Sequence, residues 1–179
     1  LSLKCRAEAA PEWTALLERQ SGWFAADGIF SIALDGADPN TGDEETLLIF
    51  SDTFVGEVKD GKPQAGYSMV HNSVAYMQGV DADATKISFH YNQDGSGKPT
   101  SLFGKDRPRM EREIFHWLGD GFVNRDLNDT LYIFAYHVMW TGDNVFDFVE
   151  PGVSLLAIPA GSRPPFSGHR TIDTPLHVK

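Results

Sequence analysis

The sequence has 179 residues, of which 41% are hydrophobic and 12% aromatic, and its formal net charge is −10 at pH 7. This is about the length of one domain, and the hydrophobic fraction excludes a disordered or collagen-like chain. The excess of 25 acidic over 15 basic residues argues against a nucleic-acid partner, because such proteins bind phosphates through clustered Lys and Arg.

Residues 1–20 are expected to form an N-terminal helical or extended segment. Within it, Pro11 precedes Trp13, Leu16 and Leu17, which recur at helical spacing. Because proline is favoured in the first turn of a helix, this pattern predicts a short helix.

Residues 21–95 have the pattern of short strands. The predicted strands are rich in β-branched and aromatic residues and cover residues 28–34, 46–55, 73–80 and 86–92. Asp-Gly pairs separate several of them and supply the positive φ angles that tight hairpins need. The pattern favours an antiparallel meander.

The polar, charged stretch 96–113 contains two prolines and is predicted to be a long connection. A second group of strands follows in 114–160, predicted at residues 121–124, 130–140, 144–150 and 154–160. Residues 161–179 are Pro-rich and are interpreted as a tail or as the start of a further unit.

The two groups of strands resemble each other. Trp23 followed by Asp27-Gly28 is matched by Trp117 followed by Asp120-Gly121, and the motif Thr-Leu-x-Ile-Phe begins at Thr46 and again at Thr130. Four strands per unit with an internal repeat are typical of β-propeller blades. We therefore expect an all-β fold with two four-stranded antiparallel blades.

Two carboxylates next to strand ends are the strongest candidates for chemistry. Asp27 precedes the first predicted strand, and Asp52 follows the apolar run Leu47–Phe50. A carboxylate at the end of a buried strand is poorly solvated, which tunes its pKa for acid or base work. Both residues are equally compatible with structural roles, as a turn residue for Asp27 and an Asx turn for Asp52.

Further polar and aromatic residues lie near these acids in the sequence. Aromatic residues could form a platform for the apolar face of a sugar or simply belong to the core. The two residues that open the third strand could donate to a ligand or end a turn. The candidates for substrate contact are Trp23, Phe24, His71, Asn72, Trp117 and Asp120.

Other chemical signatures are absent from the sequence. It has no complete P-loop and no G-x-S-x-G elbow. Its six histidines have no compact metal spacing, and its one cysteine, Cys5, excludes an intramolecular disulfide. We expect no cofactor and no metal ligand among the site residues, while a structural or axial calcium ion is left open.

Three segments together resemble a known family. Residues 22–31, 48–54 and 69–73 look like the first blade of the five-bladed β-propeller glycoside hydrolases, in particular the bacterial group related to endo-D-arabinanases that was long known only as domains of unknown function. The resemblance covers about residues 20–160.

The resemblance implies a funnel-shaped site on the propeller axis, with Asp27 and Asp52 as the catalytic pair. One carboxylate would protonate the leaving oxygen, and the other would act as nucleophile or as base for a water. A five-bladed propeller is longer than this chain, so we expect further blades from a longer chain or an oligomer, unless the strand count is wrong. In related furanosidases a third carboxylate comes from a later blade.

These observations predict a glycoside hydrolase that acts on a polysaccharide or oligosaccharide and is secreted, periplasmic or at the cell surface. The sequon at Asn128 and a first residue other than Met are compatible with secretion. No membrane span is expected. Two alternatives remain, namely a non-catalytic carbohydrate-binding or cell-surface interaction module and a structural β-domain that assembles through its open edges.

Overall fold

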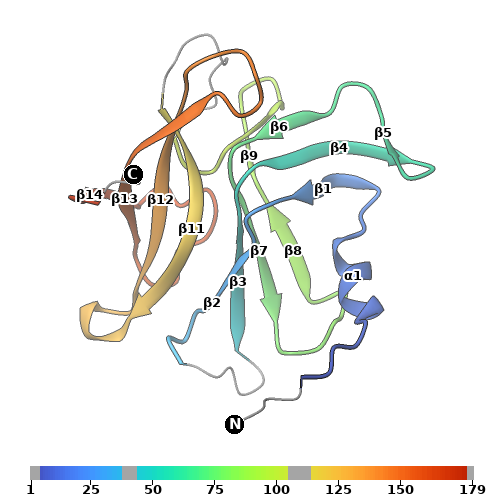
Figure 1. The fold of residues 1–179 in the computed structure, drawn as a ribbon. Coiled ribbons are helices and arrows are strands. Elements are labelled where there is room, and N and C mark those ends of the chain that lie inside the picture. The colour runs from blue at the N-terminus through green and yellow to red at the C-terminus, as the bar shows by residue number, and fades with distance from the viewer. Residues whose placement is uncertain (1–4, 38–43, 105–113, 177–179) are drawn as a thin grey trace.

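The computed structural model describes residues 5–37, 44–104 and 114–176 (Figure 1). The described part of the chain is mostly β and contains four-stranded antiparallel sheets, as the sequence predicted, but three of them rather than two, together with one two-stranded sheet. The elements in chain order are α1 (Pro11–Leu17), β1 (Ser21–Ala26), β2 (Phe30–Ala33), β3 (Glu45–Phe50), β4 (Thr53–Lys59), β5 (Lys62–Pro63), β6 (Ser68–Val70), β7 (Ser73–Gln78), β8 (Ile87–His90), β9 (Asn92–Gln93), β10 (Pro99–Thr100), β11 (Ile114–Asn124), η2 (Arg125–Leu127), β12 (Thr130–Trp140), β13 (Phe148–Ile158) and β14 (Arg170–Asp173).

The first sheet has the strand order β2-β3-β7-β8, and the second has the order β11-β12-β13-β14. The short strands β9 and β10 pair with each other. The predicted helix is confirmed as α1, with proline in its first turn, and its Leu16 packs against the first sheet.

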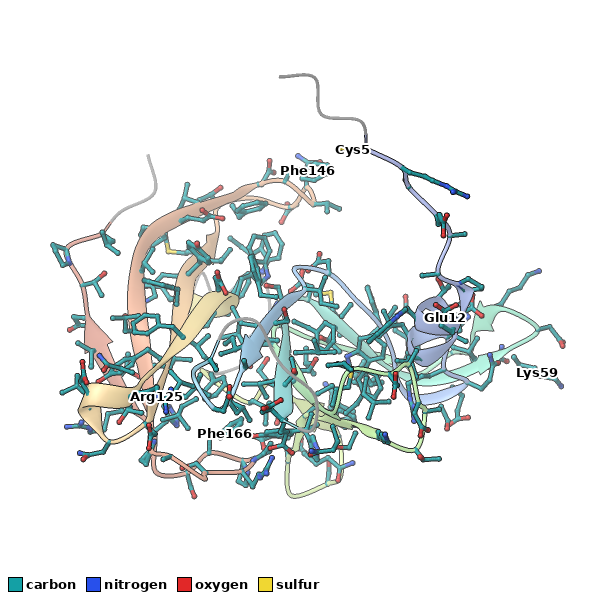
Figure 2. The ribbon with its side chains drawn as sticks, turned by 90° about the horizontal axis from the view of Figure 1, so that it is seen from below. Cys5, Glu12, Lys59, Arg125, Phe146 and Phe166 are labelled. Carbon is teal, nitrogen blue, oxygen red and sulfur yellow. The ribbon has the colours of Figure 1, made fainter. Side chains whose placement is uncertain are left out.

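The segment 46–55, predicted as one strand, is broken at Ser51 and Asp52 into β3 and β4. Opposite this break, residues 27–29 separate β1 from β2. Beyond the break, β1, β4, β5 and β6 form a ribbon that we call the arm. Figure 1 shows the arm extending above α1 and away from the second sheet. In Figure 2, Lys59 on the arm and Arg125 of η2 lie at opposite ends of the molecule.

Gly28 is the residue that permits the break. Its φ is +59°, a conformation that L side chains rarely adopt, and an added Cβ would lie 2.8 Å from Ser51 Oγ. The same Ser51 hydroxyl donates a hydrogen bond to the carbonyl of Leu118 at 3.1 Å. The break is therefore also a contact point between the two sheets.

The strand limits in the second half differ from the prediction. Residues 144–150 and 154–160 were expected to form two strands, but Phe148–Ile158 is one strand. Its register against β12 shifts around Glu150 and Pro151, a bulge of the kind that tolerates a proline. The fourth strand of this sheet is β14, which lies in the segment interpreted as a tail. Residues 105–113 of the predicted connection and 177–179 of that tail lie outside the described residues.

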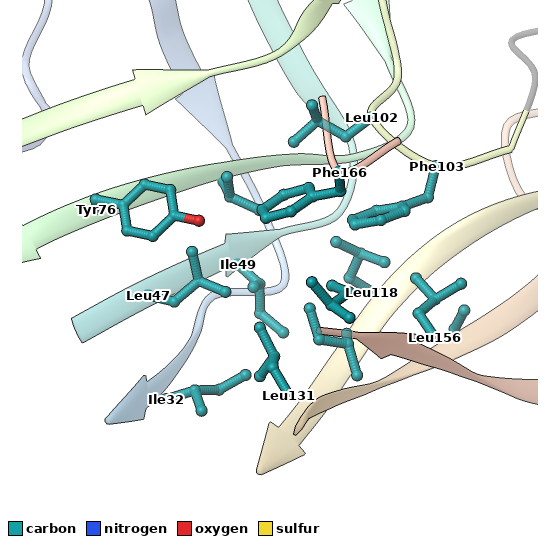
Figure 3. Close-up of a cluster of buried hydrophobic side chains, with 14 residues drawn as sticks. Ile32, Leu47, Ile49, Tyr76, Leu102, Phe103, Leu118, Leu131, Leu156 and Phe166 are labelled. Carbon is teal, nitrogen blue, oxygen red and sulfur yellow. The ribbon is translucent and has the colours of Figure 1, made fainter. Parts of the chain in front are cut away.

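The main core fills the space between the two sheets. Figure 3 shows Leu118, Leu131 and Leu156 of the second sheet opposite Ile32 and Leu47 of the first. Two aromatic rings from connecting segments complete this core. They belong to Phe103 and Phe166, which stack with their centroids 5.4 Å apart.

Asn72 is fully buried and connects three segments. Its Nδ2 donates to the carbonyls of Phe103 and His116, each at 2.9 Å, and its Oδ1 accepts from the amide of Phe103 at 2.8 Å. All three bonds join the start of β7 to the segment after β10 and to β11. The side chain therefore holds the first sheet against the second.

We expect Asn72→Ala to destabilise the fold by about 3 kcal/mol, because it leaves buried donors and acceptors without partners. Asn72→Asp should also destabilise it, since a carboxylate cannot donate to the two carbonyls. Urea unfolding measures both changes. The control is Asn124→Ala, which removes an exposed cap of η2; an equal effect at this exposed position would contradict the assignment.

His116 is a titratable group in the second sheet that is largely covered by its neighbours. It pairs across β11 and β12 with His137, with ring centroids 5.2 Å apart. Among the described residues, its buried Nδ1 has no hydrogen-bond partner. Burial, with smaller contributions from His137 and His169, lowers the pKa of His116 from 6.5 to about 4.

This depressed pKa predicts a loss of stability at acidic pH. Between pH 6.5 and about 4 the unfolded chain binds a proton at this position that the folded chain excludes, so stability falls as the pH falls. The whole effect amounts to about 3 kcal/mol. Denaturant unfolding across this range should show a shallower pH slope for His116→Gln than for the parent chain. An unchanged slope would refute the prediction.

Candidate functional site

The strand break brings the two predicted acids together. The amide of Asp27 donates to the carbonyl of Asp52 at 3.1 Å, and the amide of Ser51 donates to the carbonyl of Asp27 at 3.0 Å. The two bonds continue the antiparallel ladder across the interruption. Residues 27 and 52, which are far apart in the sequence, are thus direct neighbours within the break between the paired strands.

The carboxylate of Asp52 is held by side chains from two other elements. Trp117 of β11 donates its indole N–H to Oδ1 at 2.8 Å, and His71, between β6 and β7, places Nδ1 2.9 Å from the same oxygen. An ionised carboxylate only accepts hydrogen bonds, so His71 donates through Nδ1 when Asp52 is ionised. The side chain of Asp52 is 19% exposed, which leaves it accessible from solvent.

His71 is itself fixed from two sides. Its ring stacks on Phe115 with centroids 3.8 Å apart and an interplanar angle of 21°. Its backbone amide donates to Ser101 Oγ at 2.8 Å. The imidazole that contacts Asp52 is therefore oriented by packing as well as by its hydrogen bond.

Asp27 has a different environment from Asp52. The residue is exposed at the break, but its carboxyl group is partly covered. This partial burial is the main cause that raises the pKa of Asp27, followed by the negative charge of Asp52, while a hydrogen bond from the Asp52 backbone opposes the shift. Asp27 thus keeps its proton to a higher pH than an ordinary aspartate does.

Two of the residues expected to contact substrate have their side chains inside the fold. Trp23 is 3% exposed, stacks on Phe89 at 4.4 Å and donates its indole N–H to Ser73 Oγ at 3.1 Å. Asn72 uses its amide to join the two sheets, as described above. Both side chains are buried next to the site and do not face solvent.

The other predicted contact residues are distributed around the acid pair. Trp117 is bonded to Asp52, and Phe24 is half-buried on the arm. Asp120 is exposed in a bulge of β11, where its carboxylate accepts from the amide of Gly121 at 2.8 Å. It lines a separate hollow of about 470 Å³ with Ser31, Ala33, Thr46 and Phe122, among others. The sequence repeat with Asp27 therefore does not place Asp120 in the same site.

The sequence analysis missed two residues that support the site. Phe115 lies two positions before Trp117, a spacing that places both rings on one side of a strand, and this was a usable signal. Ser101 follows β10 in a segment that was interpreted as a connection, and nothing in the sequence marked it.

The described residues contain no group of three or more His, Cys, Asp or Glu side chains that could hold a metal ion. In the same part of the chain, the one α-helix falls far short of the length and apolar character that crossing a bilayer requires. The side chains that the site brings together are two carboxylates, an imidazole and aromatic rings.

The family model described as "Domain of unknown function (DUF5005)" matches residues 11–169, so the chain belongs to this family. In fold, it is similar to the crystal structure of a protein described as a "putative hydrolase" from Bacteroides ovatus ATCC 8483, with a TM-score of 0.64 and 17% identity. The match covers 92% of this chain and 41% of that one. The chain thus spans about two fifths of that protein's length, and the likeness concerns the fold alone. Among curated proteins, no sequence matched.

The raised pKa of Asp27 should depend on its neighbour. In an Asp52→Asn variant the negative charge is removed, so we expect the pKa of the Asp27 carboxyl to fall toward its ordinary value. Carbon-detected NMR titration of the side-chain carboxyls measures this shift. Asp35→Asn, in another Asp-Gly turn, should leave Asp27 unchanged. An unaltered Asp27 pKa in Asp52→Asn would mean that the two groups do not interact.

Proposed function

We propose that this chain carries the carboxylate pair of a glycoside hydrolase. The observation that supports this most is that two neighbouring carboxyl groups have different surroundings. The pKa of Asp27 is raised, whereas Asp52 has two hydrogen-bond donors on one oxygen. Hydrolysis of a glycosidic bond requires one protonated and one ionised carboxyl group on either side of the scissile bond. Asp27, with its raised pKa, is our candidate for the protonated group, and Asp52 is our candidate for the ionised one.

In this mechanism Asp27 is the general acid that protonates the leaving oxygen. Asp52 is the nucleophile or the base that activates a water. His71 and Trp117 both contact Oδ1, so Oδ2 is the oxygen assigned to the sugar or the water. His71 and Trp117 act as positioning residues, because they set the direction of this carboxylate.

A neutral glycan suits the charge of the protein. At a formal net charge of −10, a polyanionic substrate would be repelled. The chain covers 41% of the protein described as a "putative hydrolase" whose fold it resembles. This supports our proposal that the chain is part of a larger enzyme. We place such an enzyme outside the cytoplasm, where polysaccharides are degraded.

Activity against a panel of arabinans, xylans, fructans and galactans tests the proposal, with released reducing ends as the readout. We expect one substrate class to be cleaved, and Asp27→Asn and Asp52→Asn each to lower the rate by a factor of about 10² or more. Asp35→Asn, the same chemical change in an exposed turn, should retain full activity. With Asp27 as the acid, the rate should fall as the pH rises through its raised pKa.

Two results would overturn this proposal. Cleavage that survives both substitutions would assign the chemistry to other residues. Binding of a glycan by the folded protein without any cleavage would instead identify a carbohydrate-binding module.

A further inference from the structure

The face of the arm that continues from the acid pair can be deduced from the strand register. Phe54 of β4 lies opposite Met69 of β6, and residues opposite each other in an antiparallel pair point to the same face. Side chains two positions apart along a strand also share a face. Asp52 and His71 lie one residue outside β4 and β6, respectively. Extending the alternation by that one residue places Asp52 on the face of Phe54, and His71 on the face of Met69.

The hydrogen bond between Asp52 and His71 agrees with this deduction, because it joins the next pair of positions on the same face. Two residues along a strand correspond to about 7 Å. The aromatic ring of Phe54 is therefore on the same side of the ribbon as the proposed catalytic carboxylate and one short step from it.

Three aromatic rings gather on this face. Phe24 and Phe54 stack with centroids 6.1 Å apart, and Tyr67 meets both edge-on, at 6.2 Å and 5.6 Å. Gly56 leaves room for this cluster, because an added Cβ would lie 2.7 Å from Tyr67 Cβ. Tyr67 is 48% exposed and Met69 is 42% exposed.

The opposite face of the arm already provides its attachment to the core. Trp23 and Val55, which are paired across β1 and β4, are buried, and Trp23 belongs to the same hydrophobic cluster as Leu16 of α1. The aromatic rings on the outer face are thus additional to those that hold the arm in place. On this face Tyr67 and Met69 are exposed and Phe24 and Phe54 are half-buried. Single exposed apolar residues are ordinary, whereas adjoining ones are typical of interaction surfaces.

We propose that Phe24, Phe54 and Tyr67 form a sugar-binding subsite for a glycan chain that continues beyond the linkage at Asp27 and Asp52. Aromatic rings offer flat apolar faces to the C–H faces of sugar rings, and the Tyr67 hydroxyl adds a polar group. This inference rests on the proposed function. It specifies the substrate as a chain of several sugar units and excludes a small glycoside with a single sugar.

The test compares chain lengths in variants of the arm. Tyr67→Ala and Phe54→Leu remove rings from the cluster, and Phe122→Ala removes a ring from the exposed aromatic stack with Tyr132 on the second sheet. The probes are oligosaccharides of two to six units derived from whichever panel polymer is cleaved. We expect KM for the longest chains to rise about tenfold in the arm variants, with disaccharide cleavage unchanged and Phe122→Ala equal to the parent.

Circular dichroism confirms that each variant is folded. An unchanged KM for long chains in folded Tyr67→Ala and Phe54→Leu would overturn the subsite. An equal loss for disaccharides and long chains would also overturn it, because a structural disturbance does not depend on chain length.

Binding separates this inference from the proposed function. The parent protein could fail to cleave any of the four polymers. Affinity electrophoresis in gels that contain each polymer would then still measure how strongly the polymer retains the protein. Retention that weakens in Tyr67→Ala but not in Phe122→Ala would support the subsite although the catalytic proposal had failed. Absence of retention in all four polymers, together with absence of cleavage, would overturn both.

Discussion

The interruption shared by β1–β2 and β3–β4 is the constraint on which the rest of the structure depends. Gly28, with its positive φ and with Ser51 against the position of its absent Cβ, lets the paired strands leave the first sheet. The backbone bonds between Asp27 and its partners keep the strands together through the change. One local irregularity therefore creates the arm and exposes two carboxylates. It also gives Ser51 its bond to the second sheet.

The dipeptide His71-Asn72 shows how the site and the fold share a short segment. Successive residues of an extended chain point in opposite directions. His71 accordingly meets the carboxylate of Asp52, while Asn72 is fully buried and bonds to the backbone of Phe103. The position of the His71 imidazole therefore depends on the hydrogen bonds of Asn72. A change at Asn72 should affect both the stability of the fold and the geometry of the site.

Strands could be predicted where a long apolar and aromatic run lies between polar turns. The run Thr130–Trp140 was predicted with its observed limits, because it is long, aromatic and flanked by polar turns. Breaks and bulges were not, since Asp120-Gly121 looks like a turn in the sequence whereas the strand continues through it. All four residues of β14 are exposed, so it has no alternating pattern. Asp27 and Asp52 were chosen as candidates from their sequence motifs, and their catalytic role stays a prediction. The burial of Trp23 depends on strand register, which a single sequence does not supply.

The asymmetry between the two carboxylates is the feature that most favours catalysis over simple binding. A sugar-binding surface needs acceptors for hydroxyl groups, and two equivalent carboxylates would serve. Here His71 and Trp117 both contact Asp52. Asp27 is next to the charge of Asp52, and none of the described contacts gives it a side-chain hydrogen-bond donor. The two carboxyl groups therefore differ in their surroundings, since Asp52 has two contacts on one oxygen and the pKa of Asp27 is raised by partial burial and by the charge of Asp52. A carboxyl group with a raised pKa suits the role of general acid, and a carboxylate held in a fixed direction suits that of nucleophile or base.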